Sequence, residues 1–287
     1  MKEQTEYRFT RAGLLIEASL IILGAYFVIK FLRSYIIFPG LLKVLGNGEA
    51  ATAVIPYLGH IGFLIILLIM LVVFPADKRV FMEMLDAGKG KRIKNILIGL
   101  LVGFLMNAGL ISVAVMHGDM DMVWSNANLG FIVIAFFVVM FQSSVEELLN
   151  RSWFLARTKN HIPMPLVVFA SSFVFSMIHW LNPGITVLAA LNVFLAGVIF
   201  ALSMYYTGNV IFACAYHTAW NFTQNFLFGL PCSGTPSSLA VMAPTFTKDS
   251  FFYDPAFGIE GTVFTMIMQV VVIIILGVLI KKRGRAI

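Results

Sequence analysis

Eight long apolar runs constrain this chain more than any other feature of its sequence. To within a few residues they cover 13–33, 54–74, 95–116, 129–150, 164–181, 185–206, 210–229 and 261–280. Each run is close to the roughly 20 residues that an α-helix needs to cross the hydrocarbon of a bilayer. Hydrophobic residues make up 60% of the chain and charged residues 12%, a balance typical of membrane proteins. The sequence therefore predicts an all-α, polytopic membrane helix bundle with about eight transmembrane helices.

The runs follow one another without a soluble insertion. There is no clear linker or internal repeat, so we expect residues 1–287 to form a single transmembrane domain. The first run carries Glu17, is too long for a signal peptide and lacks a cleavage site of small residues. We expect a multi-pass integral membrane protein, which in a prokaryote would lie in the plasma membrane.

The basic residues predict the orientation of the bundle. If both termini are cytoplasmic, 16 of the 20 Lys and Arg residues fall on that side. The intervening loop 117–128 carries Asp119 and Asp121 and no basic residue. This distribution fits the positive-inside bias of membrane proteins. The net charge of +6 then reflects topology and anionic lipid headgroups, so we expect the bilayer and not nucleic acid as a partner.

Polar side chains, which are costly inside a membrane, gather in runs four to seven. They are Gln142, Glu146, Glu147, Arg151, His179, Asn192, His217, Asn221 and Asn225. Runs two and three contribute little beyond His60 and Asn107, and His60 alone is typical of a helix-packing hydrogen bonder. Ionisable groups at membrane depth usually mark a functional site. We therefore expect the site within residues 129–229.

Helix geometry divides the two adjacent glutamates. Glu147 precedes Arg151 by one turn on the same helix face, in the order that favours an ion pair. Glu146 is rotated by about 100° from Glu147 and has no cation at that spacing within its own helix. We expect Glu147 to be neutralised and Glu146 to face another helix.

Runs four, five and seven bring further polar groups to a similar depth. If the chain reverses near Asn160, Glu146 lies 14 residues before the turn and His179 lies 19 residues after it. At 1.5 Å per residue, their depths differ by only about 7 Å. In run seven, His217 and Asn221 are four residues apart and share one helix face. We expect these four side chains to converge in one cavity.

The residue types in this group suit the hydrolysis of an amide. A glutamate in apolar surroundings can accept a proton from water, while a neighbouring imidazole orients the same water. A histidine beside an asparagine can donate hydrogen bonds to the oxyanion that develops on the carbonyl. Ser143 and Ser144 are close in sequence but lack a matching acid–base partner, so the pattern does not favour a serine nucleophile.

A metal site is the alternative use of the same residues. Glu146, His179 and His217 form a ligand set that zinc accepts. However, the two histidines lie on separate runs and the sequence contains no His-Glu-x-x-His helix. Cys214 and Cys232 have no metal-ligand spacing either. We expect no cofactor, with a divalent metal such as zinc as the alternative.

Three short motifs lie in order on separate apolar runs. They read Glu146-Glu147-x-x-x-Arg151, Phe175-x-x-x-His179 and His217-x-x-x-Asn221. Together they resemble the CPBP family, named for CAAX protease and bacteriocin-processing enzymes and also called the Abi family. That family includes the Ras-converting CAAX endopeptidases. The resemblance covers residues 129–229, which would be the catalytic core.

The resemblance implies an α-helical intramembrane protease of the glutamate type. The roles that it implies are water activation by Glu146 and His179, an oxyanion hole from His217 and Asn221, and shaping of the site by Glu147 and Arg151. The partner would be a peptide or a prenylated protein. The family also suggests a non-catalytic alternative, a bacteriocin-immunity or peptide-binding membrane protein. A proton-coupled transporter is a third hypothesis, weakened because the sequence shows no repeat.

Overall fold

The computed structural model describes residues 11–86, 89–158, 161–236 and 239–284, and most of these residues are helical. The α-helices are α1 (Arg11–Leu32), α2 (Phe38–Leu45), α3 (Glu49–Leu58), α4 (Ile61–Val73), α5 (Pro75–Asp86), α6 (Arg92–His117), α7 (Leu129–Glu147), α8 (Phe154–Thr158), α9 (Met164–His179), α10 (Val187–Thr207), α11 (Ile211–Phe222) and α12 (Val263–Lys282). Short π-helical turns at Arg33–Ile37, Leu148–Trp153 and Thr223–Leu227 continue α1, α7 and α11.

The fold is an all-α polytopic membrane bundle, as the apolar runs predict. Six helical segments of the described chain are long and apolar enough to cross a membrane: Arg11–Leu45, Glu49–Val73, Arg92–His117, Leu129–Thr158, Val187–Thr207 and Val263–Lys282. The fifth and seventh predicted runs coincide with α9 and α11, which are shorter helices. The number of eight spans stays a prediction.

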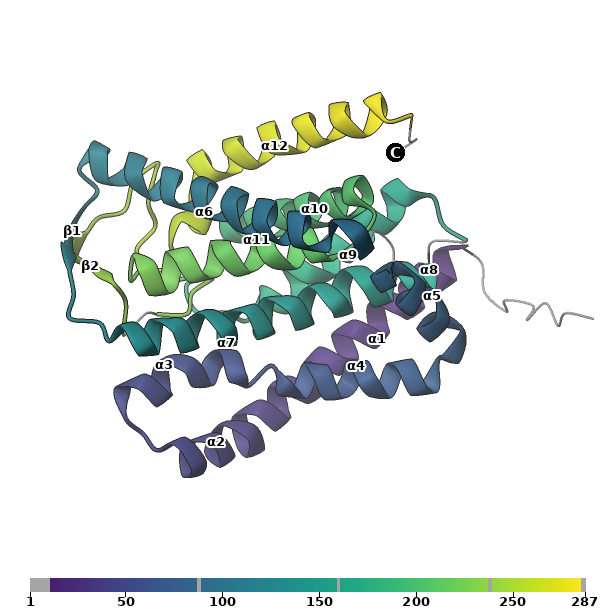
Figure 1. The fold of residues 1–287 in the computed structure, drawn as a ribbon, viewed down its shortest axis with the longest axis horizontal. Helices are drawn as coiled ribbons and strands as arrows, with labels where there is room; N and C mark the ends of the chain where they lie inside the picture. Colours follow the sequence, from purple (N-terminus) through teal and green to yellow (C-terminus); the bar gives the residue numbers. More distant parts are fainter. Residues whose placement is uncertain (1–10, 87–88, 159–160, 237–238, 285–287) are drawn as a thin grey trace, which may run out of the picture.

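Helix α11 occupies the centre of the bundle (Figure 1), packed against α6, α7 and α10. Its approach to α6 is unusually close because Gly99 and Gly103 of α6 face it. A Cβ atom added at Gly99 would lie 2.7 Å from the carbonyl oxygen of Phe212, and one at Gly103 would meet the backbone of Tyr216. Small residues at such spacing let two membrane helices approach through their backbones. The position of α11 is therefore fixed from the side of α6.

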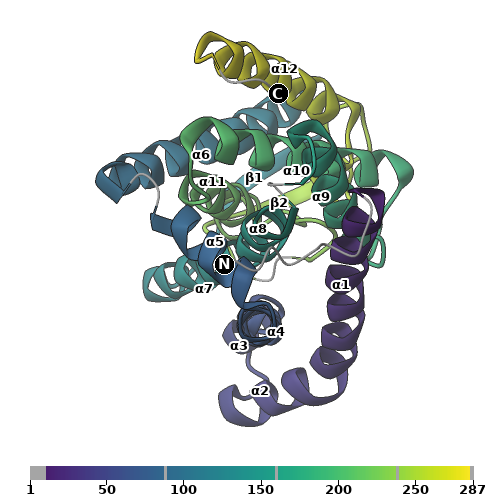
Figure 2. The ribbon, with the colours of Figure 1, turned by 90° about the vertical axis from the view of Figure 1, so that its right-hand side faces the viewer.

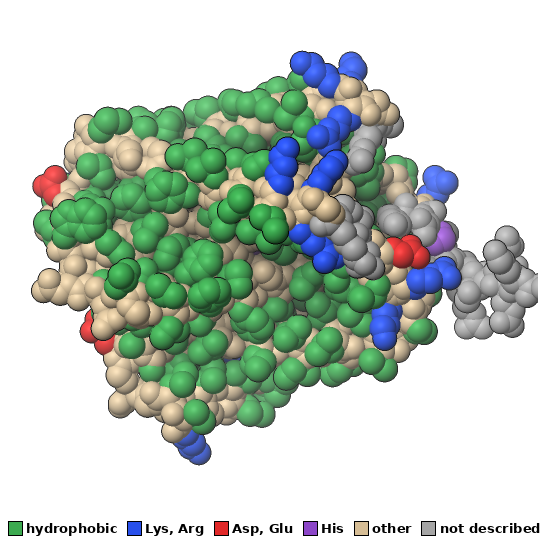
Figure 3. All heavy atoms as spheres, in the orientation of Figure 1, with side chains coloured by type: hydrophobic (Ala, Val, Ile, Leu, Met, Phe, Trp, Pro, Cys, Tyr) green, Lys and Arg blue, Asp and Glu red, His purple; other side chains and the backbone are tan. Residues whose placement is uncertain are grey.

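The two ends of the molecule differ in charge. In Figure 3, Lys and Arg side chains gather mainly at the end where α5 and the carboxyl end of α12 lie, while hydrophobic side chains cover much of the surface between the ends. The loop after α4 and the tail after α12 therefore share one end, as the positive-inside reading requires. Of the 16 basic residues counted on the predicted cytoplasmic side, Lys2, Arg8, Lys159 and Arg285 lie outside the described residues, as does the turn predicted near Asn160. The cytoplasmic placement of both termini stays a prediction.

A small sheet covers the opposite end of the bundle (Figure 1). Strand β1 (Met120–Trp124) pairs antiparallel with β2 (Met242–Thr247), although more than a hundred residues separate them in sequence. The neighbouring carboxylate of Asp119 accepts hydrogen bonds from Ser250 Oγ at 2.7 Å and from His117 Nδ1 at 3.0 Å. These contacts tie the segment after β2 to the end of α6.

The same contacts set the charge of Asp119. Burial alone raises the pKa of this carboxyl, but the hydrogen bonds from Ser250 and His117 and the nearby Lys248 ammonium outweigh burial. The pKa therefore lies below its ordinary value, and the carboxylate is the stable form at neutral pH. Lys248 Nζ lies 3.6 Å from Asp119 Oδ1.

Helices α1 to α4 form the side of the bundle opposite α12 (Figure 2). Helix α1 packs against α9 and α4, while α3 packs against α7. The chain breaks between α3 and α4 at Gly59 and His60, three residues after Pro56. The break interrupts the regular hydrogen bonding of the helix, so carbonyl groups at the end of α3 are available to a side chain.

Candidate active site

Glu147 lies at the centre of a fully buried cluster of charges. Its Oε2 lies 3.2 Å from Arg151 Nε, which is the ion pair predicted from their spacing. Its Oε1 lies 3.0 Å from His217 Nδ1 on α11. Because a carboxylate only accepts hydrogen bonds, the imidazole of His217 donates from Nδ1. Glu147 thus joins α7 to α11.

Aromatic rings enclose the other side of this cluster. The Arg151 guanidinium carbon lies 4.1 Å from the centre of the Phe175 ring and 5.3 Å from that of Phe200. The Phe200 ring is stacked on His217 with 4.8 Å between ring centres. The cation is therefore stabilised by one carboxylate and by the faces of two rings. This packing connects α7, α9, α10 and α11 around one buried charge.

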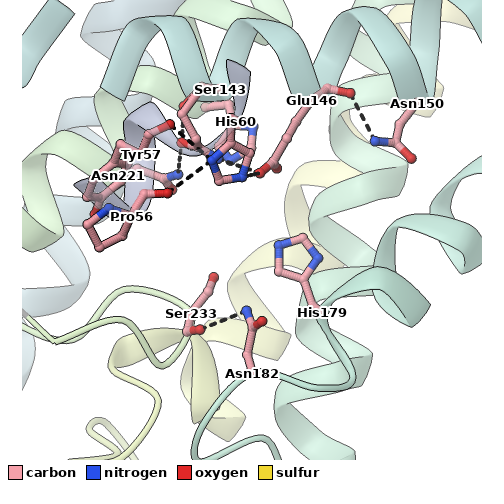
Figure 4. A network of polar contacts seen from close by, with 12 residues as sticks. Pro56, Tyr57, His60, Ser143, Glu146, Asn150, His179, Asn182, Asn221 and Ser233 are labelled. Carbon is pink, nitrogen blue, oxygen red and sulfur yellow. Dashed lines mark hydrogen bonds and ion pairs between the residues drawn. The ribbon is translucent and has the colours of Figure 1, made fainter. Parts of the chain in front are cut away.

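Glu146 has different surroundings from its neighbour. Its side chain is 9% exposed and lies on the wall of a cavity. Gln142 Nε2 donates a hydrogen bond to Glu146 Oε1, and His60 Nε2 lies 3.0 Å from the same oxygen. Asn150 Nδ2 donates to the backbone carbonyl of Glu146 at 3.0 Å. Figure 4 shows His60 and Glu146 directed toward each other.

His60 is a site residue that the sequence did not identify. Alone it is typical of a packing histidine, but the structure brings it from the break between α3 and α4 to the Glu146 carboxylate on α7. Its Nδ1 lies 3.2 Å from the carbonyl oxygen of Pro56 and 3.1 Å from that of Tyr57, at the break after α3. A proline four residues before an intramembrane histidine was the available signal. Nothing in the sequence indicated its partner on α7.

These contacts determine where the protons of His60 lie. Carbonyl oxygens only accept hydrogen bonds, so Nδ1 of His60 carries a proton. Its Nε2 then either carries a second proton, which it donates to the Glu146 carboxylate, or accepts one from a protonated Glu146. In both cases one proton lies between the two residues. Glu146 and His60 are thus a proton-sharing pair.

His179 faces the same cavity from the end of α9. Its Nδ1 donates to the Phe175 carbonyl oxygen at 2.7 Å, which fixes the ring and leaves Nε2 for the cavity side. Figure 4 shows the ring below Glu146, without a direct hydrogen bond between the two. The predicted convergence of Glu146 and His179 is therefore across cavity space and not through contact.

His217 and Asn221 also line this cavity, one turn apart on α11. Asn221 Nδ2 donates to Gln142 Oε1 at 3.2 Å, and Asn221 Oδ1 accepts from the Cys232 thiol at 3.4 Å. The four residues predicted to converge thus share one cavity of about 110 Å³. Gln142 links two of them, because it contacts both Glu146 and Asn221.

The segment after α11 closes one wall of the cavity, with Cys232, Ser233 and Thr235 in its lining. Glu260 fixes this segment. Its Oε2 accepts from both the backbone nitrogen and the hydroxyl of Ser233 at 2.6 Å, and its Oε1 accepts from Trp220 Nε1 at 2.8 Å. Glu260 is a second residue that the sequence reading missed, because it lies in a loop far from the motifs.

The described side chains do not form a cluster of metal ligands. Within residues 11–86, 89–158, 161–236 and 239–284, no group of three or more His, Cys, Asp and Glu side chains lies close enough to hold a metal ion. In the alternative set of Glu146, His179 and His217, the Nδ1 atoms of both histidines donate to other acceptors, which leaves Nε2 of each ring as the available ligand atom. The zinc alternative stays a prediction.

The fold and this cavity define a class: a membrane helix bundle that encloses a glutamate, histidines and an asparagine at one site. Residues 128–223 match the family model of the type II CAAX prenyl endopeptidase Rce1-like family. The match supports the resemblance to the CAAX protease family that the three motifs indicate. The matched segment contains Glu146, His179, His217 and Asn221, whereas His60 and Glu260 lie outside it. Comparison with curated proteins and with solved structures finds no match.

Proposed function

We propose that the protein is an intramembrane endopeptidase that hydrolyses a peptide bond of a membrane-associated or prenylated, CAAX-type substrate. The observation that carries this proposal is the single cavity lined by Glu146, His179, His217 and Asn221. The family match over residues 128–223 supports a protease of this general type. In a prokaryote the enzyme would act in the plasma membrane.

Glu146 and His179 would activate the water. His179 holds the water through Nε2, since Nδ1 is already bonded to Phe175. The water oxygen bonds to the substrate carbonyl carbon while its proton passes to Glu146. When the carbon–nitrogen bond breaks, Glu146 returns this proton to the departing nitrogen. The products are a carboxylic acid and an amine.

His217 and Asn221 would stabilise the oxyanion formed in the first step. Glu147 holds a proton on Nδ1 of His217, so Nε2 donates to the oxyanion when the ring is an imidazolium. That positive charge strengthens the hydrogen bond to a developing negative charge in a site of low dielectric constant. The Asn221 amide has a second N–H besides the one that it donates to Gln142.

His60 would position the base. It holds Oε1 of Glu146 together with Gln142, which fixes the plane of the carboxylate. With the shared proton on His60 Nε2, Glu146 is a carboxylate and is able to take the proton of water. His60 acts here through Glu146 and does not contact the substrate.

Purified protein in detergent tests the proposal against a prenylated CAAX peptide and a panel of membrane peptides. We expect Glu146→Gln and His179→Ala to lower cleavage by roughly 10²–10⁴-fold, the usual contribution of acid–base catalysis. Glu83→Gln is the matched control, because this side chain is 64% exposed on α5. Activity should survive exhaustive chelation if no metal takes part.

Two results would contradict an endopeptidase. Cleavage by Glu146→Gln at the rate of the unchanged protein would remove the proposed base. Equal binding of the peptides by both forms, with no cleavage by either, would assign the non-catalytic peptide-binding or immunity function. A growth-protection assay with Glu146→Gln then distinguishes binding from hydrolysis.

A further inference from the structure

Arg33 is a basic residue in an unexpected place. Four Lys and Arg residues lie away from the predicted cytoplasmic side: Lys30, Arg33, Lys43 and Lys248. Of these, Lys43 lies on α2 and Lys248 lies near Asp119. Arg33 instead lines the cavity that contains Glu146. Long basic side chains near helix ends usually reach outward to the membrane interface, so its inward position requires an explanation.

The neighbouring residues hold Arg33 in this position. Its guanidinium carbon lies 4.6 Å from the centre of the Phe38 ring, a stacking geometry that stabilises a cation. On the other side it passes close to Gly59, where an added Cβ atom would lie 3.1 Å from Arg33 Nε. Gly59 immediately precedes His60, the partner of Glu146. The guanidinium is thus held beside the proton-sharing pair.

Arg33 differs from the other arginines of the bundle interior in having no carboxylate. Arg151 is paired with Glu147, and Arg157 with Glu17 and Asp77. In the part of the chain that the structure describes, no Asp or Glu side chain lies within 4.0 Å of Arg33. Glu146 lines the same cavity but lies beyond ion-pair distance, and a cation within a membrane bundle that lacks a direct ion pair usually serves binding or transport. The cavity therefore presents an unpaired guanidinium to whatever enters it.

We propose that Arg33 binds the free α-carboxylate of the peptide substrate. The proposal rests on the endopeptidase function and assigns recognition of the carboxyl terminus of a CAAX-type substrate to Arg33, a residue outside the segment that the family model matches. A guanidinium matches a carboxylate through two parallel hydrogen bonds. Arg33 also offsets the repulsion that a second carboxylate would meet beside Glu146.

The size of the cavity limits how far the carboxylate lies from the cleavage point. Arg33 and Glu146 line the same space of about 110 Å³. At roughly 10–15 Å³ per water, this holds about eight waters, which is room for a short stretch of peptide only. A substrate carboxylate at Arg33 therefore places a bond near the carboxyl terminus at Glu146.

A lipid phosphate is the other oxyanion that a membrane supplies. Arg33 shares its cavity with Glu146, His179 and Asn221, the groups assigned here to peptide hydrolysis, and this favours the peptide. A headgroup at the same position would occupy the space that the substrate needs. The peptide carboxylate is therefore the proposed ligand, and the lipid is an outcome of the test.

The test uses two prenylated peptides that are identical except that one ends in a free carboxylate and the other in an amide. We expect the full-length protein in detergent to cleave the acid with a kcat/KM about tenfold to hundredfold higher than the amide, the usual range for a charge-assisted hydrogen bond. In Arg33→Gln this ratio should fall to about one, mainly through KM. Arg33→Lys keeps the positive charge but loses the planar guanidinium, so it should retain part of the preference for the acid peptide. Lys43→Gln is the control and should keep the full ratio.

A binding measurement separates this proposal from the proposed function. In a Glu146→Gln background, the acid peptide should bind more tightly than the amide, and adding Arg33→Gln should remove the difference. A binding preference without cleavage by the unchanged protein would refute hydrolysis and leave Arg33 as the carboxylate site. Cleavage of acid and amide at equal rates would refute the role of Arg33 and leave hydrolysis intact.

The lipid alternative has its own arm. The protein is placed in vesicles of phosphatidylcholine alone or with anionic phosphatidylglycerol. We expect the acid peptide to be cleaved faster than the amide in both kinds of vesicle. An effect of Arg33→Gln that appears only with the anionic lipid, and equally for both peptides, would assign Arg33 to a headgroup and overturn the proposal. Thermal unfolding of each variant shows that the comparison is made between folded proteins.

Discussion

Glu146 and Glu147 are neighbours in sequence, yet their carboxylates have different surroundings. Glu147 contacts a cation and an imidazole, both within the segment matched by the family model, and it is inaccessible to solvent. Glu146 lies on a cavity wall and shares a proton with His60, which lies outside that segment. The first carboxylate connects helices, whereas the second can exchange protons. A rotation of about 100° on one helix thus gives two neighbouring carboxylates different partners.

Removal of Arg151, the cation beside Glu147, should have the largest effect on the difference between the two carboxylates. A buried charge that loses its partner costs about 3–5 kcal/mol, so Arg151→Ala should lower the free energy of unfolding by about this amount. Glu146→Gln should lower it by less, about 1.5–3 kcal/mol, the usual size of a charge-assisted hydrogen bond. Thermal unfolding in detergent measures both. Equal losses would mean that the two carboxylates do not differ in kind.

A variant of His60 tests whether its contact with Glu146 affects catalysis. We expect His60→Gln to lower kcat by about tenfold to hundredfold, because a charge-assisted hydrogen bond contributes about 1.5–3 kcal/mol. The pH profile of kcat should also change, since the group that shares a proton with Glu146 is gone. His117→Gln is the control, because its half-exposed side chain lies outside the cavity. A loss of stability with an unaltered pH profile would make His60 a packing residue.

Asp119 is a hydrogen-bonded carboxylate outside the membrane-spanning helices. Its substitution is expected to have the smallest effect on the free energy of unfolding. Its pKa is depressed in the folded protein, so its contribution to stability is present above the unfolded pKa of about 3.9 and is lost as the pH falls through the folded value. At neutral pH, Asp119→Asn should lower the free energy of unfolding by about 1 kcal/mol. Unfolding measured from pH 7 down to pH 3 should show this difference shrinking below about pH 4. A constant difference would show that charge is not involved.

The parts of the molecule that follow from local sequence could be predicted. The helical bundle follows from the length of the apolar runs, and the Glu147–Arg151 pair follows from a spacing of four residues on one helix. The shared cavity of His217 and Asn221 follows from the same spacing on α11. In each case the deciding geometry lies within a single helix.

The remaining features depend on contacts between elements that sequence spacing does not determine. His60 reaches Glu146 only because the chain breaks at Gly59 and α4 packs beside α7. Arg33 enters the cavity through a π-helical turn at the end of α1. Glu260 and the β1–β2 pair join segments that no periodicity relates. These positions are set by packing, so a pattern in one segment could not reveal them.

Helix α6 contributes no residue to the lining of the cavity described here. It nevertheless sets the position of α11, which forms one wall of that cavity. Its Gly103 faces the backbone of Tyr216 and the methyl group of Ala219, the residues just before His217 and between His217 and Asn221. A larger residue there would push α11 as a whole and move His217 and Asn221 relative to Glu146. The positions of His217 and Asn221 relative to Glu146 therefore depend on the absence of one Cβ atom on a helix outside the cavity lining.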